Sequence, residues 1–501
     1  MGFENVQQAL AKLDELQATS AAYNHAMGVL GVDASTAAPS ASAQERGKTM
    51  AVLSGVMYGL IANPENRELA DYLTAHADEL DAQRRRQVEL MKKSFEQISR
   101  IPQEEYVAYQ VLLNEADSVW RKAKAENDFD SFAPVLEKIF DYNRKFAGYY
   151  NPQLPAYDAL LNEYEEGLTM QTLDAFFAQL REAIVPLVHA IAQKKQPEDG
   201  FLRSGYSVHI QREFSDYLME TMGIDKTRCT ISETEHPFTA GFNNHDVRIT
   251  THYHDDVSSS MYSVIHEGGH ALYELGYEDR YNATVLAGGA AMSIHESQSR
   301  FYENIIGRGL AFVRLIFPKM QELFPQQLAN VTTEQVYRAV NKAQPSLIRT
   351  EADELTYPLH IMVRYELEKK LIEGTLKVQD LPQAWNAMMK EYLGIDVPDD
   401  AQGCLQDTHW SGGMIGYFPS YALGSAYAAQ MKAVMEKEIG SIEELVAKGE
   451  LSRVTAWLKE HIHAHGCLYT PGELFERSCG TFDAKYYTDY LAEKFSALYE
   501  L

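Results

Sequence analysis

The sequence predicts a mainly α-helical protein with one small β-sheet. Apolar residues recur at helical spacing over most of the 501 residues, and an alternating, β-branched pattern replaces that spacing only between Arg228 and His254. The chain is 45% hydrophobic and 23% charged, an ordinary globular composition that suffices for a large core. The sequence contains no run of 18 apolar residues, so no membrane span is expected.

Amphipathic helices with short polar breaks are expected in the first part of the chain, over residues 5–30, 41–62, 66–99, 102–126, 130–148 and 169–194. Nothing in this half looks catalytic, and its charged runs are typical of solvated helix faces. Helices are expected again over residues 309–323, 333–343, 350–373, 381–395, 420–438, 451–464 and 483–499. A loop from Gly403 to Ser420, rich in Gly, His and aromatic residues, interrupts them, and long loops of this kind usually carry function.

Two β-strands are expected between these groups of helices. Cys229 to Ser232 and Val247 to Thr251 alternate and are β-branched, while Gly241 to Asp246 is expected to form the loop between them. The edge of such a sheet can pair with an extended peptide backbone.

Charge and cysteine content narrow the choice of partners and compartment. The net charge of −26 argues against nucleic acid or an anionic membrane surface as a partner. The four cysteines form no close pair and no metal-type spacing, so we expect reduced thiols in a cytoplasmic protein. The segment from Met1 to Leu30 carries acidic residues early and is not typical of a signal peptide.

The pentapeptide His266-Glu267-Gly268-Gly269-His270 carries the residues best suited to chemistry. Its flanking residues place it within a helix, where residues four apart share a face. Both imidazoles can then reach one divalent metal ion, and Glu267 holds the general-base position of HExxH metallopeptidases. A chance match is the alternative. In a helix interior each glycine lowers helix stability by about 1 kcal/mol relative to Ala. Two glycines at this place therefore predict that another group approaches the helix closely there.

A third protein ligand has to come from a second element. Glu274 lies about 12 Å along the helix axis from His266, at 1.5 Å per residue, which is too far for a shared ion. Glu296, 26 residues after His270, is the best candidate. Its alternative role is a helix capping box with Ser293.

A second metal site is a weaker hypothesis. His461, His463 and His465 follow one another closely, but histidines near a helix end are explained more simply by the helix dipole and by Gly466, which ends the helix.

Five strings of residues, in order, resemble the carboxypeptidase Taq family of metallocarboxypeptidases. They are His236-Pro237-Phe238, Asp246-Val247-Arg248-Ile249-Thr250, the pentapeptide with His295-Glu296-Ser297-Gln298, Ile348-Arg349-Thr350-Glu351-Ala352-Asp353, and Gly403-Cys404-Leu405-Gln406-Asp407-Thr408-His409-Trp410. Each string is weak alone, but all five in order are specific. The N-terminal half shows only general helical similarity, and Val32 to Ser42 lacks the Trp-Asp and Met-Pro residues of the family pattern.

The resemblance implies a single large helical domain over residues 1–501, split by a deep substrate groove with the metal at its floor. An N-terminal helical half covers about residues 1–200 and a catalytic half about residues 201–501. The resemblance also implies a homodimer that removes single residues from peptide C-termini with broad specificity. It implies one divalent metal ion per chain, zinc or alternatively cobalt.

Roles follow from the chemistry together with the resemblance. Glu267 deprotonates a metal-activated water and returns the proton to the leaving amine. His236, His409 and Tyr417, with Tyr421 in reserve, are candidate donors to the developing oxyanion, and ordinary packing is their alternative role.

The substrate's free carboxylate requires an anchor. Arg349 and Arg248 are the candidates for binding it, and Gln406 is assigned to the same substrate-binding group. The alternative for the arginines is a structural ion pair, with Asp353 for Arg349 and with Asp246 for Arg248.

Two other functions compete with a metallocarboxypeptidase. An endo-acting oligopeptidase on the same scaffold shares the metal site but needs no carboxylate anchor. A helical binding protein that keeps a metal site without turnover is the third possibility, and Glu267 argues against it because a binding protein has no use for a base beside the ligands.

Overall fold

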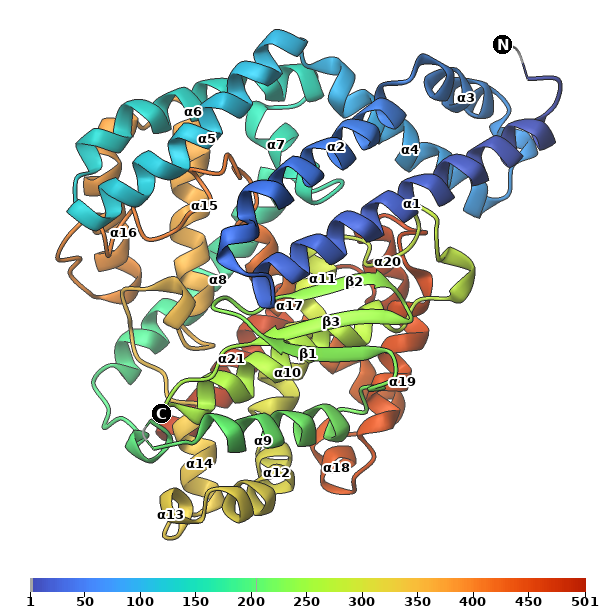
Figure 1. The fold of residues 1–501 in the computed structure, drawn as a ribbon. Coiled ribbons are helices and arrows are strands. Elements are labelled where there is room, and N and C mark those ends of the chain that lie inside the picture. The colour runs from blue at the N-terminus through green and yellow to red at the C-terminus, as the bar shows by residue number, and fades with distance from the viewer. Residues whose placement is uncertain (1–2, 204) are drawn as a thin grey trace.

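A computed structural model describes residues 3–203 and 205–501 and confirms a mainly helical fold with one small sheet (Figure 1). The helices before the sheet are α1 Val6–Thr36, α2 Ala43–Ala62, α3 Pro64–Ala75, α4 Ala82–Arg100, α5 Gln103–Glu126, α6 Phe129–Tyr150, α7 Ala156–Tyr164, α8 Met170–Ile191 and α9 Val208–Thr221. The single helix expected over residues 66–99 is wrong. The chain breaks after α3, and the Asp81 side chain caps α4 by accepting a hydrogen bond from the Arg84 backbone N–H.

The sheet has three strands, β1 Cys229–Glu233, β2 Thr239–Asn243 and β3 Asp246–Thr251, in the order β1-β3-β2. β1 is parallel to β3 and β2 is antiparallel to it. The loop expected over residues 241–246 is therefore wrong, because residues 241–243 belong to β2 and Asp246 begins β3. A register shift at Gly241 and Asn243 lets the glycine lie against Glu274, whose carboxylate oxygen is 2.5 Å from the place of an added Cβ.

The helices after the sheet surround α10 Val257–Glu274, which contains the pentapeptide. They are α11 Met292–Arg300, α12 Leu310–Leu323, α13 Pro325–Leu328, α14 Thr333–Val340, α15 Tyr357–Glu373, α16 Leu381–Leu393, α17 Pro419–Ile439, α18 Ile442–Ala447, α19 Leu451–His461, α20 Pro471–Cys479 and α21 Lys485–Tyr499. The segment expected as one helix from residue 350 starts at Tyr357 instead, because Arg349–Glu351 forms a separate 3-10 turn. A π-helical segment, η5 Phe301–Gly307, continues α11 directly.

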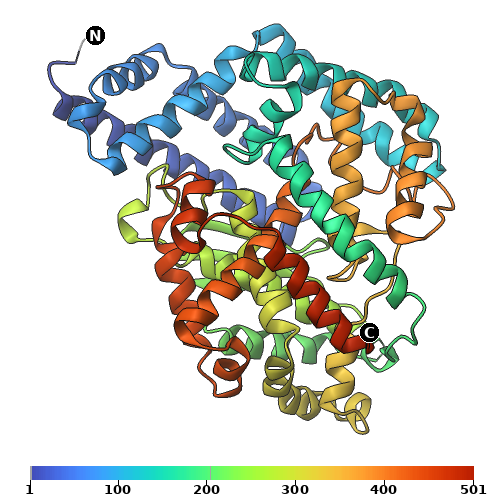
Figure 2. The same ribbon diagram turned by 180° about the vertical axis from the view of Figure 1, so that it is seen from behind.

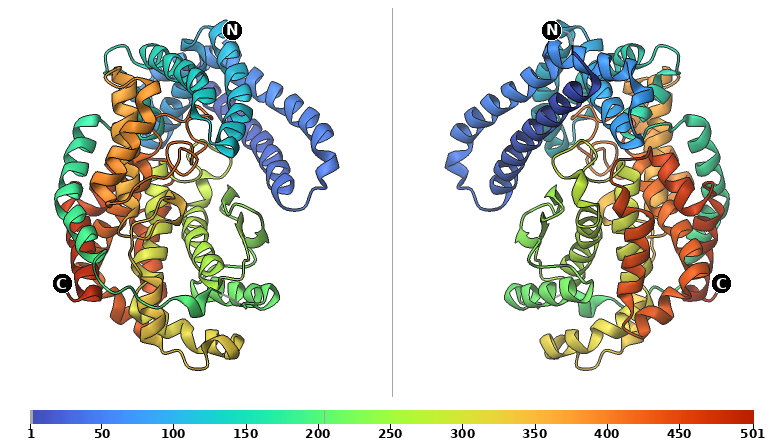
Figure 3. Two further views of the ribbon diagram at one scale, coloured as in Figure 1. Left: turned by 90° about the vertical axis from the view of Figure 1, so that its left-hand side faces the viewer. Right: turned by 90° about the vertical axis from the view of Figure 1, so that its right-hand side faces the viewer.

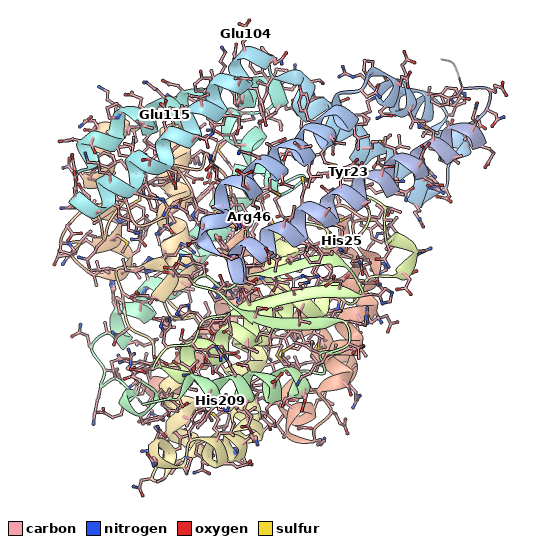
Figure 4. All side chains as sticks on the ribbon, viewed as in Figure 1. Tyr23, His25, Arg46, Glu104, Glu115 and His209 are labelled. Carbon is pink, nitrogen blue, oxygen red and sulfur yellow. The ribbon has the colours of Figure 1, made fainter. Side chains whose placement is uncertain are left out.

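Packing joins the two halves of the chain. The largest buried cluster includes Trp120 of the N-terminal half and Tyr499 of the last helix, and α8 and α21 lie side by side on the back of the molecule (Figure 2). α1 and α2 form a hairpin that projects beside the sheet (Figure 3). His25 on α1, labelled in Figure 4, has its ring 5.0 Å from that of Phe242 on β2.

No helix in the described part of the chain is long and apolar enough to cross a membrane.

Candidate metal centre

His266, His270 and Glu296 meet where α10 packs against α11. Nε2 of His266 lies 3.7 Å and Nε2 of His270 lies 3.5 Å from the same carboxylate oxygen, Oε2 of Glu296. The three donor atoms all lie within 4.8 Å of one another. The capping box that would compete for Glu296 is not formed, because α11 has Ala291 at its N-cap and the Ser293 hydroxyl donates to Glu165.

Hydrogen bonds behind the two histidines fix which nitrogen faces Glu296. Nδ1–H of His266 donates to Oε2 of Glu303 at 2.8 Å. Nδ1 of His270 lies 2.6 Å from Nδ1 of His295, whose Nε2–H donates to Glu274 at 2.7 Å. This order leaves the Nε2 lone pairs of His266 and His270 free beside a carboxylate. Two imidazoles and one carboxylate form a donor set suited to a divalent ion such as Zn²⁺. Although burial opposes the effect, Glu296 and Glu303 raise the pKa of His266, so a metal ion would have to displace its proton.

The electrostatic surroundings keep Glu296 ionised. Burial alone would raise its pKa, but the neighbouring Arg300 and His266 hold the pKa below its usual range. Nε of Arg300 donates to Oε1 of Glu296 at 2.7 Å, while Oε2 accepts a hydrogen bond of 3.1 Å from the Ser299 hydroxyl and faces both histidines. Burial lowers the pKa of His270 to about 4, which favours the neutral, metal-binding imidazole.

Glu267 lies beside the triad and is buried. Its carboxylate accepts a hydrogen bond of 2.6 Å from the hydroxyl of Thr239, the first residue of β2. Burial raises the pKa of Glu267 above its ordinary value. A carboxylate with a raised pKa is a better proton acceptor than one in water, as a general base requires.

The two glycines of the pentapeptide mark close helix contacts. A Cβ at Gly269 would lie 2.6 Å from the backbone oxygen of Gln298 and 2.8 Å from Cα of Ser299, both on α11. A Cβ at Gly268 would meet only the flexible side chains of Met222 and Ile224. The predicted close approach therefore exists, and at Gly269 it brings the backbones of α10 and α11 together.

Tyr417 and Tyr421 stand next to Glu296, where α17 begins. Gly424, one turn after Tyr421, lies so close to Glu296 that an added Cβ would be 2.7 Å from its Cβ. Nε2 of His409 is 3.3 Å from the Tyr421 hydroxyl, and burial lowers the His409 pKa to about 4. His236 is placed differently, because it is exposed in the loop between β1 and β2 and has no recorded contact with the triad among the described residues.

Arg349 is buried in a cluster that reaches the metal ligands. Its Nε and Nη2 donate to Oδ1 of Asp407 at 3.0 and 2.9 Å, and the fully buried Arg364 donates to Oδ2 at 2.6 Å. Nη1 of Arg349 donates to the Tyr357 hydroxyl at 3.2 Å, and Arg300 stacks on the ring of Tyr357 at 4.5 Å. Two guanidinium groups share one carboxylate, so the cluster keeps a positive charge close to Glu296.

The other two candidates for substrate binding have local partners. Arg248 on β3 forms a two-pronged ion pair with Asp246 at 3.0 Å and stacks on Phe242. Gln406 accepts from the backbone N–H of Arg349 and from the Arg364 side chain, and donates to three backbone carbonyls. The ion pair considered for Arg248 is thus present.

The ion pair considered for Arg349 is wrong. Asp353 instead lies in the turn before α15, where it accepts hydrogen bonds from the backbone N–H groups of Leu355 and Thr356.

Four residues of the site were missed from the sequence. Glu303, Arg300 and Glu274 hold the metal ligands or their partners, and Thr239 holds Glu267. Arg300 and Glu303 follow Glu296 at spacings of four and seven residues, so a search of its helical face would have found them. Glu274 lies four residues after His270 on the same helix, whereas nothing local marks Thr239.

The three histidines near the end of α19 have separate surroundings. Nε2 of the buried His463 lies 2.8 Å from the Gln298 side chain, while Nδ1 of His461 lies 2.9 Å from the Trp457 carbonyl. Within the described residues, the group suited to hold a metal ion is His266, His270 and Glu296.

Comparison with known proteins identifies the family. Residues 12–495 match the family model described as carboxypeptidase Taq (M32) metallopeptidase. The chain belongs to the carboxypeptidase Taq (M32) family. It is 40% identical to "Carboxypeptidase 1" of Bacillus subtilis over 96% of both chains, and 37% identical to "Thermostable carboxypeptidase 1" of Pyrococcus furiosus over 98% of both.

The solved structure of an M32 carboxypeptidase from Deinococcus radiodurans matches this member of the family with a TM-score of 0.96. It is 37% identical, and the match covers 98% of this chain and 100% of that one. The M32 chain described here is therefore a metal-dependent carboxypeptidase, and the family resemblance of its sequence strings is confirmed.

Proposed function

We propose that this protein hydrolyses the last peptide bond of its substrates with Glu267 as general base and with His266, His270 and Glu296 as metal ligands. A divalent ion held by these groups supplies Lewis-acid chemistry, acidifying a water molecule and polarising the scissile carbonyl. Glu267 takes the proton of the attacking water and delivers it to the leaving amine. The hydrogen bond from Thr239 keeps its carboxylate turned toward the triad.

The observation that carries the exopeptidase mechanism is the excess positive charge at Arg349. A C-terminal carboxylate lies one residue beyond the bond that is cut, so its anchor has to stand near the metal ligands. Tyr357 connects the two, because it contacts Arg300, which binds Glu296, and also accepts a hydrogen bond from Arg349. Arg248, whose charge is paired with Asp246, is assigned a secondary role.

The oxyanion that develops on the carbonyl is assigned to donors on the neighbouring loop. Tyr417 on this loop and Tyr421 at the start of α17 are the candidates, and Nε2 of His409 lies 3.3 Å from the Tyr421 hydroxyl. The role of His236 as a donor to the oxyanion remains a prediction, and it would apply to the substrate-bound enzyme. The edge strand β2, whose Thr239 touches Glu267, is proposed to pair with the substrate backbone.

Finer properties are proposed on the same basis. The metal is zinc, with cobalt as an alternative, the specificity is broad, and the location is cytoplasmic, in keeping with four unpaired cysteines. The chain forms a single domain, since its main core draws on both halves.

A homodimer is proposed as the functional assembly. Six of the large hydrophobic side chains that are exposed among the described residues lie on α2 and α5: Val52, Val56, Tyr58, Tyr106, Val107 and Val111. Exposed apolar side chains of this kind favour association between copies.

A variant with glutamine in place of the base tests the mechanism. Glu267→Gln should keep one metal ion per chain, because Glu267 is not a ligand, while peptide hydrolysis falls by several orders of magnitude. Metal content is measured by elemental analysis and turnover by mass spectrometry of the released residue. Near-wild-type turnover with the metal retained would remove Glu267 from the mechanism.

A further inference from the structure

The loop that carries His409 and Tyr417 closes around a single buried carboxylate, that of Glu368 on α15. Oε1 of Glu368 accepts a hydrogen bond from Nε1 of Trp410 at 2.7 Å, and Oε2 accepts from the backbone N–H of Gly416 at 2.9 Å. The two donors stand at either end of the segment between His409 and Tyr417. Glu368 is fully buried, so these bonds replace the water that it loses.

The third donor to Glu368 comes from the N-terminal half of the chain. The hydroxyl of Tyr157 on α7 donates to Oε2 at 2.7 Å. All three donors are neutral, and no ion pair to Glu368 is present among the described residues. Burial raises the pKa of Glu368, and Arg364, one turn earlier on α15, opposes that rise but forms its own ion pair with Asp407. The three hydrogen bonds therefore hold the buried carboxylate in one geometry.

The same helix also supports the loop directly. Gly416 has φ +93°, and an added Cβ there would lie 3.2 Å from the backbone of Leu160 and Leu161 on α7. Farther along α7, the ring of Tyr164 meets that of Tyr417 edge-on at 5.3 Å. α7 was not expected from the sequence, and the N-terminal half showed nothing that looked catalytic.

We infer that Glu368 and Tyr157 are positioning residues that fix the loop bearing His409 and Tyr417 against the metal centre. The inference rests on the role proposed above for those two side chains in the transition state. Second-layer groups of this kind set the orientation of the residues that touch the substrate. The N-terminal half thereby takes part in catalysis through α7 without touching the substrate.

Glu368→Gln tests the inference with almost no change in shape. An amide has one oxygen, so either Trp410 or Gly416 faces an NH2 group and loses its acceptor. In the zinc-loaded enzyme, kcat should fall about 10- to 100-fold while KM changes less than about threefold, since the loop acts mainly in the transition state. Tyr157→Phe should lower kcat in the same way but less, and the metal content of both variants should equal that of wild type.

Matched controls involve a second carboxylate on the same helix. Glu366, two residues before Glu368, accepts a hydrogen bond of 3.1 Å from the hydroxyl of Tyr392 on α16 and also pairs with Arg181. Glu366→Gln and Tyr392→Phe therefore change a tyrosine–carboxylate bond of α15 that does not involve the loop. Both should keep wild-type kcat. A loss of kcat in these controls equal to that of Glu368→Gln would show a general weakening of α15 and overturn the inference.

A double-mutant cycle separates this inference from the proposal on which it rests. Glu368→Gln combined with Tyr417→Phe should be little worse than the more damaging single variant, because both changes act through one loop. If Glu368→Gln keeps wild-type kcat while Tyr417→Phe loses it, the positioning role alone is overturned. The same conclusion follows if the kcat losses of the two single variants multiply fully in the double variant. Wild-type kcat in both Tyr417→Phe and His409→Gln would overturn the transition-state role of the loop, and the inference with it.

Discussion

Glu303 binds Nδ1 of His266 at 2.8 Å from the π-helical segment that continues α11. Glu303 lies seven residues after Glu296 and orients His266 so that its Nε2 faces the Glu296 carboxylate. π-Helical turns are rare in proteins, and many of those that occur lie at functional sites. Here α11 and the π-helical segment form one continuous stretch. This stretch supplies both the metal ligand Glu296 and the carboxylate of Glu303, which orients His266.

Substitutions of Glu303 should lower metal affinity in a graded way. Glu303→Gln keeps an acceptor for His266 and should bind zinc about 10-fold more weakly, whereas Glu303→Ala should lose about 100-fold. Glu296→Ala, which removes a ligand, should lose more than either. Competition with a chromogenic chelator measures the affinities. Equal affinity in wild type and Glu303→Ala would show that Glu303 has no part in orienting His266.

The adjacent glycines of the pentapeptide should respond differently to the same substitution. Gly269→Ala forces a methyl group into the backbone of α11 and should destabilise the protein by about 1–3 kcal/mol. Gly268→Ala meets only side-chain ends and gains helix propensity, so the two effects should roughly cancel. Urea denaturation of the zinc-loaded variants measures both. A Gly269→Ala protein as stable as Gly268→Ala would contradict the close helix contact.

Glu165 should make stability fall as pH rises. Burial raises its pKa from 4.5 to about 7, so the folded protein holds this proton more tightly than the unfolded chain. Its contribution is therefore complete below about pH 4.5 and is lost as pH rises through about 7. Glu165→Gln keeps the bonds to Ser293, since the serine hydroxyl can accept from the amide. Relative to wild type, this variant should gain about 3 kcal/mol of unfolding free energy between pH 4.5 and 8.

The neighbouring Glu166 is the control for that pH dependence. Although burial opposes the effect, Arg86 and Lys93 lower its pKa, so its contribution is present at neutral pH and is lost in acid. Glu166→Gln should accordingly cost more stability at pH 7 than at pH 4, the opposite trend. The same trend in both variants, followed by urea denaturation, would exclude the assigned titration of Glu165.

The sequence predicted the parts of the site that follow from helical spacing. His266 and His270 share a helix face at any location in a fold, and Glu296 was found because it lies in the next helical stretch. The role of Thr239 depends on how β2 packs against α10, and that of Glu274 depends on how α11 brings His295 to it, and no local pattern encodes either packing. Asp407 pairs with Arg349 across 58 residues, whereas the nearer Asp353 was the partner considered in the alternative role.

The errors in the fold have similar physical causes. Gly241 and Asn243 are typical of turns, yet they belong to a strand because β3 and Glu274 hold them there. α7 is short and has few local signals, and its packing against Glu368 and Gly416 stabilises it. The long amphipathic helices, whose apolar faces are set by sequence alone, were predicted well.

The most direct test of the account compares two peptides that differ only in a free or an amidated C-terminus. Wild-type enzyme should release the last residue of the free peptide and act poorly on the amide, with products followed by mass spectrometry. Arg349→Ala should lose about 10- to 100-fold in kcat/KM on the free peptide, the value of a charged hydrogen bond, and change little on the amide. Arg248→Ala should lose less. Equal cleavage of both peptides at internal bonds by the wild type would contradict the carboxylate anchor and favour an endo-acting oligopeptidase.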